Sequence, residues 1–566
     1  MTISERPWWR DAVVYQIYPR SFADANNDGT GDVRGMIDKL DYLADLGVTA
    51  VWVSPWYPSP MADGGYDVSD YCDIDPTFGT LADADEFIEK AHAHGIRVLI
   101  DLVPNHCSEA HPAFRAALAA GPGSPERALF HFRDGVGEDG SQPPNNWGSL
   151  FGGSAWERVV GPQGPEQWYL HMFAPQQPDW NWSNPDVVGL FDDVIRFWFD
   201  RGVDGLRVDV ADGLAKDMAM PDVPVDPATG LGISWYYKGH PWWNQPALDA
   251  IQRHWREIAD SYADGGQGER IFVCEANVKE LPDLMKFVEP GRMHTTFNFD
   301  MLACEWDAGS LRAVIDRNLI AHAAVGAPTT WVLGNHDSTR VATRYGKPET
   351  GRPFSLDGAP VEWLSRFAEY FYPMPTDIGL GRRRARAAAL LELALPGPAY
   401  VYQGEELGLP EVEDLPVEVL DDPSYFRTGG RVRGRDGCRV PLPWSGTRPP
   451  YGFGTDAEPW LPQPPQWAAL SAEAQAADPD STLSLYRRAL AIRATHPALG
   501  DGMLAWGETY PGTVLFFTRE PGFGFLANLS GEAVELPAGA EVLVVSAPLD
   551  GALVPPDTAC WLSLRG

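Results

Sequence analysis

Short runs of apolar residues alternate with longer amphipathic segments along most of the chain. The short runs are rich in β-branched residues, and in the longer segments apolar residues return every three or four positions. The segment 33–46, for example, carries Ile37, Leu40 and Leu43 and stops before Gly47, which is typical of an amphipathic helix. This alternation of strands and helices predicts an α/β fold built on a parallel sheet.

Eight strands of this kind are predicted. Their ranges are 13–18, 50–53, 97–102, 205–209, 271–275, 295–299, 330–333 and 399–402. Eight successive strand–helix units predict a (β/α)8 (TIM) barrel, in which reactive residues follow the carboxyl ends of the strands. The Pro- and Gly-rich stretch 409–465 is expected to lie over the barrel mouth as loops.

Two regions depart from this rhythm. Residues 107–185, between the third and fourth strands, are rich in Gly, Pro, Trp and Phe and too long for an ordinary loop, which predicts a small inserted domain. After a helical segment at 484–494, short strands at 513–517, 524–529 and 541–545 predict an all-β C-terminal domain of the sandwich type. The predicted units are a barrel of residues 1–106 and 186–500, an inserted domain of residues 107–185 and a C-terminal domain of residues 501–566.

Charge and composition narrow the possible partners. The 566 residues include 44 Lys and Arg against 78 Asp and Glu, a formal net charge of −34. This charge repels phosphate backbones and anionic lipids, so we expect no nucleic-acid or membrane partner, while a neutral or cationic ligand stays open. Six scattered cysteines without a CxxC pair favour free thiols. Because no leader pattern and no apolar run of ~18 residues is present, we expect a cytoplasmic protein.

Acidic residues follow three of the predicted strands. Strand 205–209 ends with Asp209, two residues after Arg207. Side chains alternate in a strand, so the two share a face, and alone they would be read as a structural ion pair. Glu275 and Asp337 also follow predicted strands. In a barrel these acids converge at one end, where carboxyl groups shift one another's pKa values, so the pattern predicts acid–base chemistry.

An ordered set of segments resembles a known family. The segments 101–106 (DLVPNH) and 205–209 (GLRVD), then Glu275 and 335–337 (NHD), occur in the order seen in the α-amylase superfamily, family 13 of the glycoside hydrolases. The chain is most similar to the branch of α-glucosidases and oligo-1,6-glucosidases. Further matching segments are 15–22 (YQIYPRSF), 63–67 (DGGYD), 177–182 (QPDWNW), 402–408 (YQGEELG) and 434–439 (GRDGCR). The resemblance spans nearly the whole chain, and the ordered set makes it specific.

The resemblance implies a retaining α-glucosidase that forms a covalent glucosyl-enzyme. Asp209 would be the nucleophile, with Arg207 keeping it ionised and oriented. Glu275 would be the general acid/base, a role that requires a raised pKa. Asp337 would bind sugar hydroxyls and stabilise the transition state.

The same resemblance implies a set of substrate-binding residues. His106 and His336 would hydrogen-bond hydroxyls of the glucosyl ring, and Tyr66 would stack under it. Asp63 and Arg435 would pair to close the site behind a single glucose. Without the resemblance, Asp63 would be interpreted as a turn residue before two glycines.

The roles of several aromatic residues, and of one asparagine beside them, stay open between two interpretations. Phe151 and Phe173 are expected to line the site, although a place in the core of the inserted domain is nearly as well supported. Trp242, Trp243 and Asn244 are expected either to shape the leaving-group side or to form part of a surface loop.

Residues next to the nucleophile and the acid/base bear on specificity. Val210 is expected to contact substrate and resembles the oligo-1,6-glucosidase pattern more than the Thr of strict α-1,4 enzymes. Asp212 and the pair Ala276–Asn277 depart from the His and the aromatic residue seen in relatives, and we expect them to face the second sugar. The preferred linkage and leaving group therefore stay open.

The segment 24–32 (DANNDGTGD) places oxygen donors at alternate positions, as a hard cation requires. It is not an EF-hand, because its twelfth position is Gly35 rather than Glu. The resemblance implies a structural Ca2+ or Mg2+. Its ligands would be Asp24, Asn26, Asp28, the Thr30 carbonyl and Asp32. A turn without an ion is the alternative, and no organic cofactor is expected.

The leading hypothesis is an exo-acting α-glucosidase of maltose-, isomaltose- or sucrose-like substrates, with transglucosylation as a further activity. The nearest alternatives are a sucrose or maltose isomerase and a transglucosylase on the same scaffold. A non-catalytic binding relative would lack the three acids, and a metal-dependent barrel hydrolase would need clustered ligands at one strand end. The oligomeric state stays open.

Overall fold

A parallel sheet of eight strands forms the centre of the protein. The computed structural model describes residues 7–161, 164–227, 229–234, 239–242, 246–278, 280–351, 371–372 and 374–564. The strands are β1 (Val13–Ile17), β2 (Ala50–Val53), β3 (Arg97–Leu102), β7 (Gly205–Val208), β8 (Ile271–Cys274), β9 (Thr295–Thr296), β10 (Trp331–Val332) and β11 (Ala399–Tyr402). Their order is β10-β11-β1-β2-β3-β7-β8-β9, and every neighbouring pair is parallel. A hydrogen bond from Thr330 Oγ1 to the Thr296 carbonyl joins the two ends of this order. The predicted (β/α)8 fold is confirmed.

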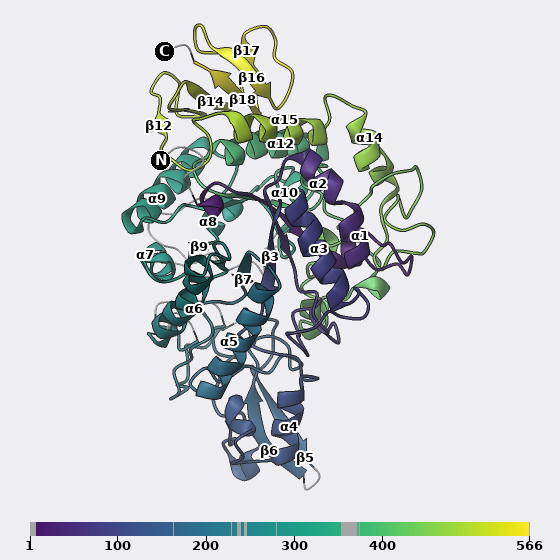
Figure 1. The fold of residues 1–566 in the computed structure, drawn as a ribbon, viewed down its shortest axis with the longest axis vertical. Coiled ribbons are helices and arrows are strands. Elements are labelled where there is room, and N and C mark those ends of the chain that lie inside the picture. The colour runs from purple at the N-terminus through teal and green to yellow at the C-terminus, as the bar shows by residue number, and fades with distance from the viewer. Residues whose placement is uncertain are drawn as a thin grey trace.

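Helices follow the strands around this sheet (Figure 1). They are α3 (Leu81–Ala93), α5 (Pro185–Asp200), α6 (Ala247–Asp264), α7 (Leu281–Met285), α9 (Ala308–Val325), α10 (Val341–Arg344) and α12 (Ile378–Ala394). In α5 the buried residues include Val187, Phe191, Val194 and Trp198, which recur at the spacing of one helix face. Burial of such a face at roughly 25 cal/mol per Å2 of apolar area is the main force that fixes these helices on the sheet.

Two elements differ from the apolar pattern, one by an interruption and one by an early end. The helix predicted at 33–46 is divided into α1 (Val33–Asp38) and α2 (Leu40–Leu46), and Gly47 ends it in the left-handed conformation with φ of 94°. The strand predicted at 295–299 ends at Thr296, because the Asn298 side chain accepts a hydrogen bond from the Asp300 amide and begins α8 (Phe299–Ala303). In the strand, local capping therefore overrides the apolar run.

A small lobe projects from one end of the barrel (Figure 1). It contains α4 (Pro112–Ala120) and a three-stranded antiparallel sheet of β4 (Phe132–Arg133), β6 (Gly164–Leu170) and β5 (Trp156–Gly161). These elements lie inside the range predicted for the inserted domain. The residues at which one domain passes into the next remain a prediction.

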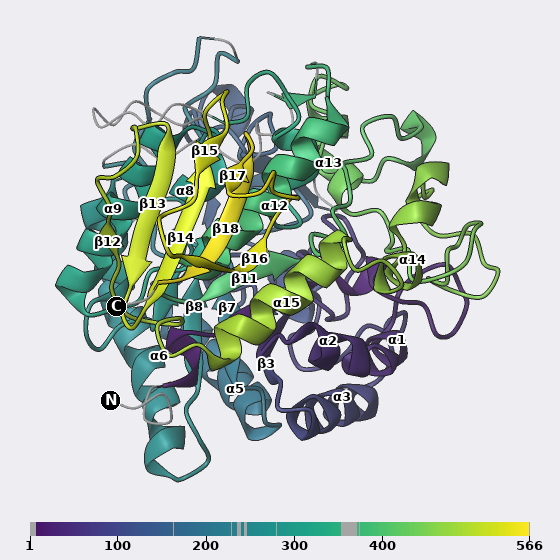
Figure 2. The same cartoon turned by 90° about the horizontal axis from the view of Figure 1, so that it is seen from above.

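An all-β region lies at the opposite end. Its five-stranded sheet contains β12 (Ala505–Trp506), β13 (Val514–Arg519), β14 (Phe523–Asn528), β18 (Thr558–Ser563) and β16 (Glu541–Val545), and a two-stranded sheet contains β15 (Val534–Glu535) and β17 (Leu553–Val554). In β14, Phe523 and Phe525 belong to the core shared with the barrel, whereas Leu526 packs in a separate cluster with Val554 of β17. The large sheet therefore buries one face against α12 and α15 (Thr482–Thr495) and the other under the small sheet (Figure 2).

Three remaining sequence predictions concern the surface and the thiols. The segment 409–465 is mostly loop, with one short α-helix, α13 (Pro423–Arg427), and short 3-10 helices at Val417–Val419 and Asp436–Cys438. All six cysteines are free thiols, as predicted. Among the residues that the structure describes, no helix combines the length and the apolar character needed to cross a membrane.

Candidate active site

The predicted acids follow the carboxyl ends of neighbouring strands. Asp209 comes directly after β7 and Glu275 directly after β8. The sheet's hydrogen bonds continue past both strands, since the Asp209 amide donates to the Leu102 carbonyl at 2.9 Å and the Glu275 amide donates to the Val208 carbonyl at 2.9 Å. This backbone ladder places the two carboxyl groups side by side.

Arg207 connects the acids through a single guanidinium. Its Nη1 lies 2.7 Å from Asp101 Oδ1 and 2.6 Å from Asp209 Oδ1, and its Nη2 lies 2.6 Å from Glu275 Oε2. Arg207 is 1% exposed. One cation therefore serves three buried carboxyl groups, which rules out the simple two-residue ion pair.

This excess of acids changes their protonation. Burial raises the pKa of Asp209 well above its usual value, the Arg207 guanidinium opposes the shift, and the carboxyl groups of Glu275 and Asp101 add to it. Burial also raises the pKa of Asp101, to about 6, again against Arg207. Both shifts favour a proton held within the cluster, and such a proton belongs to the interacting carboxyl groups together. A glycosidase needs one such proton to protonate the leaving group.

Val210 has a strained backbone. Its φ is 46°, in the left-handed region that a β-branched residue rarely occupies. In this conformation the Val210 amide lies 3.4 Å from Glu275 Oε2, and the next amide, of Ala211, donates to the Glu275 carbonyl at 2.8 Å. Backbone strain of this kind costs on the order of 1–3 kcal/mol and collects at functional sites. Here it bends the chain towards Glu275 directly after Asp209.

Asp337 lies in a second cluster, which is organised by arginines. Arg435 Nη2 lies 2.7 Å from Asp63 Oδ1, its Nη1 lies 3.0 Å from Asp337 Oδ1, and its Nε lies 2.5 Å from Asp422 Oδ2. Arg439 Nη2 also contacts Asp337 Oδ1, at 2.9 Å. Burial raises the pKa of Asp337, but the charges around it, including both guanidiniums, outweigh burial and hold it well below the usual value. Asp337 is therefore ionised at neutral pH, and the predicted pair of Asp63 and Arg435 is present.

The predicted histidines lie between these clusters and are neutral. Burial lowers the pKa of both His106 and His336 to about 3. His336 Nδ1 lies 2.7 Å from Gln16 Nε2, which donates to it and so assigns the ring proton to Nε2, 3.4 Å from Asp337 Oδ2. Tyr66 stacks on the His336 ring with centroids 5.2 Å apart. Neutral rings can donate and accept hydrogen bonds with sugar hydroxyls.

The aromatic residues divide into two groups. Phe173 lies 5.0 Å from the His106 ring and 5.4 Å from Phe151, and the Arg435 guanidinium lies 5.1 Å from the Phe151 ring. Both phenylalanines therefore border the site. Trp242 is fully buried and packs against Trp147 at 5.2 Å, so the surface-loop interpretation is wrong for it. Trp243 and Asn244 lie outside the described residues.

Five residues complete the site that were not named as candidates from sequence. They are Asp101, Gln177, Lys216, Asp422 and Arg439. Gln177 Nε2 donates to Asp63 Oδ2 at 3.0 Å, and the buried Lys216 Nζ lies 2.9 Å from Asp179 Oδ2 and 2.8 Å from Asn105 Oδ1. Asp101, Gln177 and Arg439 lie inside the segments that match the family, so the sequence could have identified them as site residues. Lys216 and Asp422 lie outside those segments, so the sequence did not identify them, and only the fold brings them to the site.

Asp212 is fully buried, and the charged groups nearest to it are Glu275 and Lys216. Its expected place facing the second sugar stays a prediction. Burial raises the pKa of Asp212 to about 8, although the nearby amides of Asp212 and Asn277 oppose the shift.

We expect Asp212→Asn to stabilise the enzyme increasingly as the pH rises. Below about pH 4 both the folded and the unfolded chain carry a protonated Asp212, and between that pH and about 8 only the folded chain does. Wild-type stability therefore falls with pH through this window, by up to ~1.4 kcal/mol per pH unit from this one group. Melting curves of both proteins at about pH 5.5 and 8 measure the difference. Equal differences at the two pH values would contradict the assignment.

The loop predicted to bind a cation is closed by its own amides. Asp24 accepts hydrogen bonds from the amides of Asn27 and Gly29, and Asp32 accepts from those of Ala25 and Gly35. The oxygen donors suit Ca2+ or Mg2+ in type. Among the described residues, however, no three carboxylates, histidines or cysteines converge as a metal cluster. The cation remains a prediction, and no catalytic step below depends on it.

If Ca2+ binds this loop, the melting temperature should rise when Ca2+ is added to chelator-treated enzyme, because a ligand bound only by the folded state stabilises it. A rise of about 2 °C or more is expected at saturation. Asp28→Asn should weaken the response, since it removes one carboxylate ligand. Identical melting of the chelated, Ca2+-treated and Mg2+-treated enzyme would contradict the prediction.

The barrel and the paired buried carboxyl groups at the ends of its strands define a glycoside hydrolase of the (β/α)8 class. The family description "Alpha amylase, catalytic domain" matches residues 16–359 and 374–502. The chain belongs to the α-amylase family, family 13 of the glycoside hydrolases.

Two relatives and one solved structure are similar to this chain over most of its length. The chain is 36% identical over 558 residues to a "Probable alpha-glucosidase" of Rhizobium meliloti (strain 1021), covering 94% of this chain and 92% of the relative. It is 34% identical over 533 residues to an "Oligo-1,6-glucosidase" of Heyndrickxia coagulans, covering 88% and 86%. The solved structure of the "alpha-glucosyl transfer enzyme, XgtA" superposes with a TM-score of 0.82 at 35% identity, covering 99% and 100%.

Proposed function

We propose that this enzyme is a retaining, exo-acting α-glucosidase. It would release terminal α-linked glucose from disaccharides and short oligosaccharides with maltose-, isomaltose- or sucrose-like linkages. The observation that carries the proposal is the contact of one guanidinium with both Asp209 and Glu275. The Glu275 carboxyl also lies within hydrogen-bond reach of Asp209. An inverting pair would instead be separated by about 6.5–9.5 Å to admit a water molecule.

In the first step Asp209 attacks the anomeric carbon while Glu275 gives its proton to the leaving glycosidic oxygen. The glycosidic bond breaks, and an ester forms between Asp209 and the glucosyl group. Arg207 remains in contact with both carboxyl groups, so it orients the nucleophile and balances the negative charge left on Glu275. In the second step Glu275 deprotonates a water molecule, which cleaves the ester and releases α-glucose.

Asp337 and the histidines would bind the hydroxyl groups of the reacting ring. Asp337 is kept ionised by Arg435 and Arg439, so it can accept hydrogen bonds that strengthen as the ring becomes an oxocarbenium-like ion. The ion pair of Asp63 and Arg435 closes one side of the site. A closed side supports removal of single terminal units rather than cleavage within a long chain.

The test is product analysis with a panel of α-linked glucose disaccharides and sucrose. Proton NMR of the first glucose formed should show the α-anomer before mutarotation. Release of β-glucose first would contradict the retaining mechanism, and release of no glucose from any substrate would contradict the glucosidase.

Transglucosylation is the second candidate, favoured by the structural similarity to an α-glucosyl transfer enzyme. In that reaction a sugar hydroxyl replaces water in the second step, and an isomerase would return the glucosyl group to the released sugar. Chromatography at high substrate concentration separates these outcomes, because transfer gives products longer than the substrate and isomerisation gives a new disaccharide without net glucose release.

The six free thiols also support a place in the reducing cytoplasm.

A further inference from the structure

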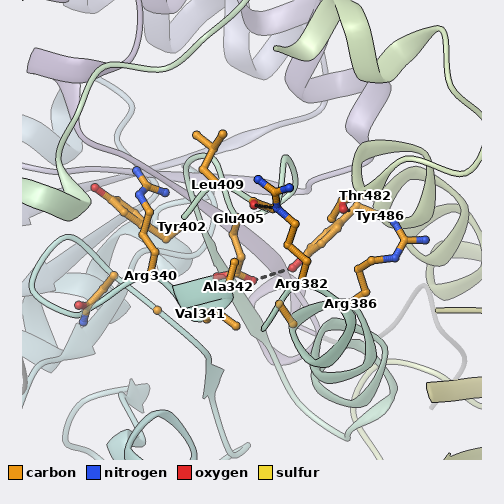
Figure 3. A pocket seen from close by; sticks show the side chains of 14 residues that line it. Arg340, Val341, Ala342, Arg382, Arg386, Tyr402, Glu405, Leu409, Thr482 and Tyr486 are labelled. Atoms are coloured by element: carbon orange, nitrogen blue, oxygen red, sulfur yellow. Dashed lines mark hydrogen bonds between the residues drawn. The ribbon is translucent and has the colours of Figure 1, made fainter. Parts of the chain in front are cut away.

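Several arginines outside the catalytic carboxyl cluster hold the protein's own backbone. Arg340 and Arg386 line a small space beside α12 and α15 (Figure 3). Arg340 donates from Nη1 to the Gln403 carbonyl at 2.9 Å and from Nη2 to the Cys438 carbonyl at 2.7 Å. Arg386 donates from Nε to the Ser546 carbonyl at 2.8 Å. These guanidiniums join chain segments that are distant in sequence.

Arg427 joins two segments in the same way, but beside the candidate active site. It is the last residue of α13, and its Nε donates to the Gly152 carbonyl at 2.9 Å. Its Nη2 donates to the same carbonyl at 2.5 Å and lies 3.4 Å from the Ser154 carbonyl. Gly152 and Ser154 belong to a turn of residues 149–154, which lies between β4 and β5 in the lobe. One side chain therefore fastens this lobe turn to α13.

The lobe turn fits closely against the end of α13. Gly152 and Gly153 have φ of 95° and 77°, in the left-handed region that favours glycine. A Cβ atom on Gly152 would lie 3.4 Å from Thr428 Cγ2, and one on Gly153 would lie 3.1 Å from Arg427 Nη2. The two glycines therefore leave room for the guanidinium to reach the backbone of the turn.

The other end of α13 is anchored to an arginine of the candidate site. Asp422, which caps the helix, accepts hydrogen bonds from the Arg435 amide at 2.8 Å and from Arg435 Nε at 2.5 Å. The Asp422 amide also donates to Asp436 Oδ2 at 3.1 Å. Arg435 in turn contacts Asp63 and Asp337. The position of α13 is therefore fixed relative to the residues proposed to bind glucose.

Phe151 connects the lobe turn back to the same arginine. It directly precedes Gly152, it is 5% exposed, and its ring lies 5.1 Å from the Arg435 guanidinium. The contacts therefore form a closed circuit, from Arg435 through Asp422 and Arg427 to the lobe turn and through Phe151 back to Arg435. Within this circuit, Arg427 sets how closely Phe151 is held at the site.

We propose that Arg427 is a positioning residue for sugar binding, which holds the lobe turn, and with it Phe151, against the site. This role rests on the proposed function, in which Phe151 borders the bound glucose. Arg207 orients Asp209 and Glu275 separately from the circuit. A displaced Phe151 should therefore weaken binding of the sugar in its ground state and its transition state alike, which raises KM and leaves kcat unchanged.

A double-mutant cycle tests this role. The variants are Arg427→Gln, Phe151→Ala and the combination of both, with Arg427→Lys as the conservative replacement. Arg431→Gln is the matched control, because Arg431 is exposed in the same loop and its Nε donates within that loop, to the Thr428 carbonyl at 3.2 Å. KM and kcat are measured with an aryl α-glucoside, and melting curves show whether each variant folds as the wild type does.

Arg427→Gln should raise KM by about tenfold and change kcat by less than about twofold. Phe151→Ala should raise KM at least as much. The double variant should raise it no further than Phe151→Ala alone, because Arg427 acts through Phe151. Arg427→Lys should restore part of the lost affinity, since its ammonium group can still donate to the Gly152 carbonyl. Arg431→Gln should behave as the wild type does.

Hydrogen exchange gives a readout that does not depend on catalysis. In Arg427→Gln the backbone amides of residues 149–154 should exchange faster, because the turn opens more often once it is released from α13. The melting temperature should change little, since the Ser149 amide still donates to the Gly153 carbonyl at 2.8 Å. Exchange of the same segment should be unchanged in Arg431→Gln.

Three results with an active wild type would overturn the proposal. The first is an unchanged KM in Arg427→Gln. The second is a KM in the double variant that equals the product of the two single effects, which would show that Arg427 does not act through Phe151. The third is equal exchange of residues 149–154 in Arg427→Gln and Arg431→Gln. An inactive wild type would instead overturn the proposed function, and the role of Arg427 with it.

Discussion

Replacing Asp209 by asparagine should lower kcat by about 10^4-fold or more, because the variant cannot form the glucosyl ester. The melting temperature should change little or rise. In the wild type Asp209 is buried beside Glu275 and Asp101, and these neighbours raise its pKa. The neutral amide removes that repulsion, while Arg207 keeps its contacts with Asp101 and Glu275. Activity on an aryl α-glucoside and a melting curve of the same preparation measure both effects.

A companion variant makes this result decisive. The amide introduced by Asp209→Asn could deamidate slowly and restore the nucleophile, whereas Asp209→Ala cannot regain a carboxylate. Both variants should therefore be inactive at early times, and only the asparagine variant should regain activity on storage. Activity within a factor of about ten of the wild type in Asp209→Ala would show that another group is the nucleophile.

Replacing Arg207 by glutamine should damage both activity and stability, unlike Asp209→Asn. Its guanidinium is the only cation within 4.0 Å of Asp101, Asp209 and Glu275 among the described residues. Its loss leaves three buried carboxyl groups without a cation, a change that typically costs ~3–5 kcal/mol. The nucleophile also loses the contact that orients it, so kcat/KM should fall by about 10^3-fold or more.

The matched control is Arg201→Gln on the surface of the barrel. Arg201 lies 2.7 Å from Asp85 Oδ1, but both side chains are partly exposed, so its loss should cost below ~1 kcal/mol and leave activity unchanged. If Arg207→Gln and Arg201→Gln had the same melting temperature and the same activity, the three-carboxyl arrangement around Arg207 would not be the organising feature of the site. Denaturation and steady-state kinetics of the two variants decide this.

The sequence predicts the barrel well because its strands are buried on both faces. The run 97–102, with four apolar residues among six, matches β3 residue for residue. Where a side chain caps the backbone locally, the same pattern is misleading, as at Asn298, which begins a helix inside the predicted strand 295–299. The apolar pattern therefore predicts which residues are buried. The residue at which a strand or helix ends can depend on a single capping hydrogen bond, which that pattern does not show.

In the candidate site, too, some residues could be placed from the sequence and others depended on the fold. Residues that directly follow strands, such as Asp209 and Glu275, could be placed from the pattern and the matching segments. The φ of 46° at Val210 and the contact of Asp422 with Arg435 could not. Both depend on the path of loops whose ends are far apart in sequence. The full burial of Asp212 could not be predicted either, because this residue lies in the loop after β7 and its burial depends on how that loop folds.

The central claim is that Asp209 forms a covalent bond to the glucosyl group while Glu275 moves the proton. Reaction with 5-fluoro-α-glucosyl fluoride tests it most directly, since the ring fluorine slows both steps and the fluoride leaving group speeds the first, so the intermediate accumulates. Mass spectrometry of the digested enzyme should find one fluoroglucosyl group on the peptide that contains Asp209. A label on any other residue, or turnover of the reagent without any label, would contradict the account.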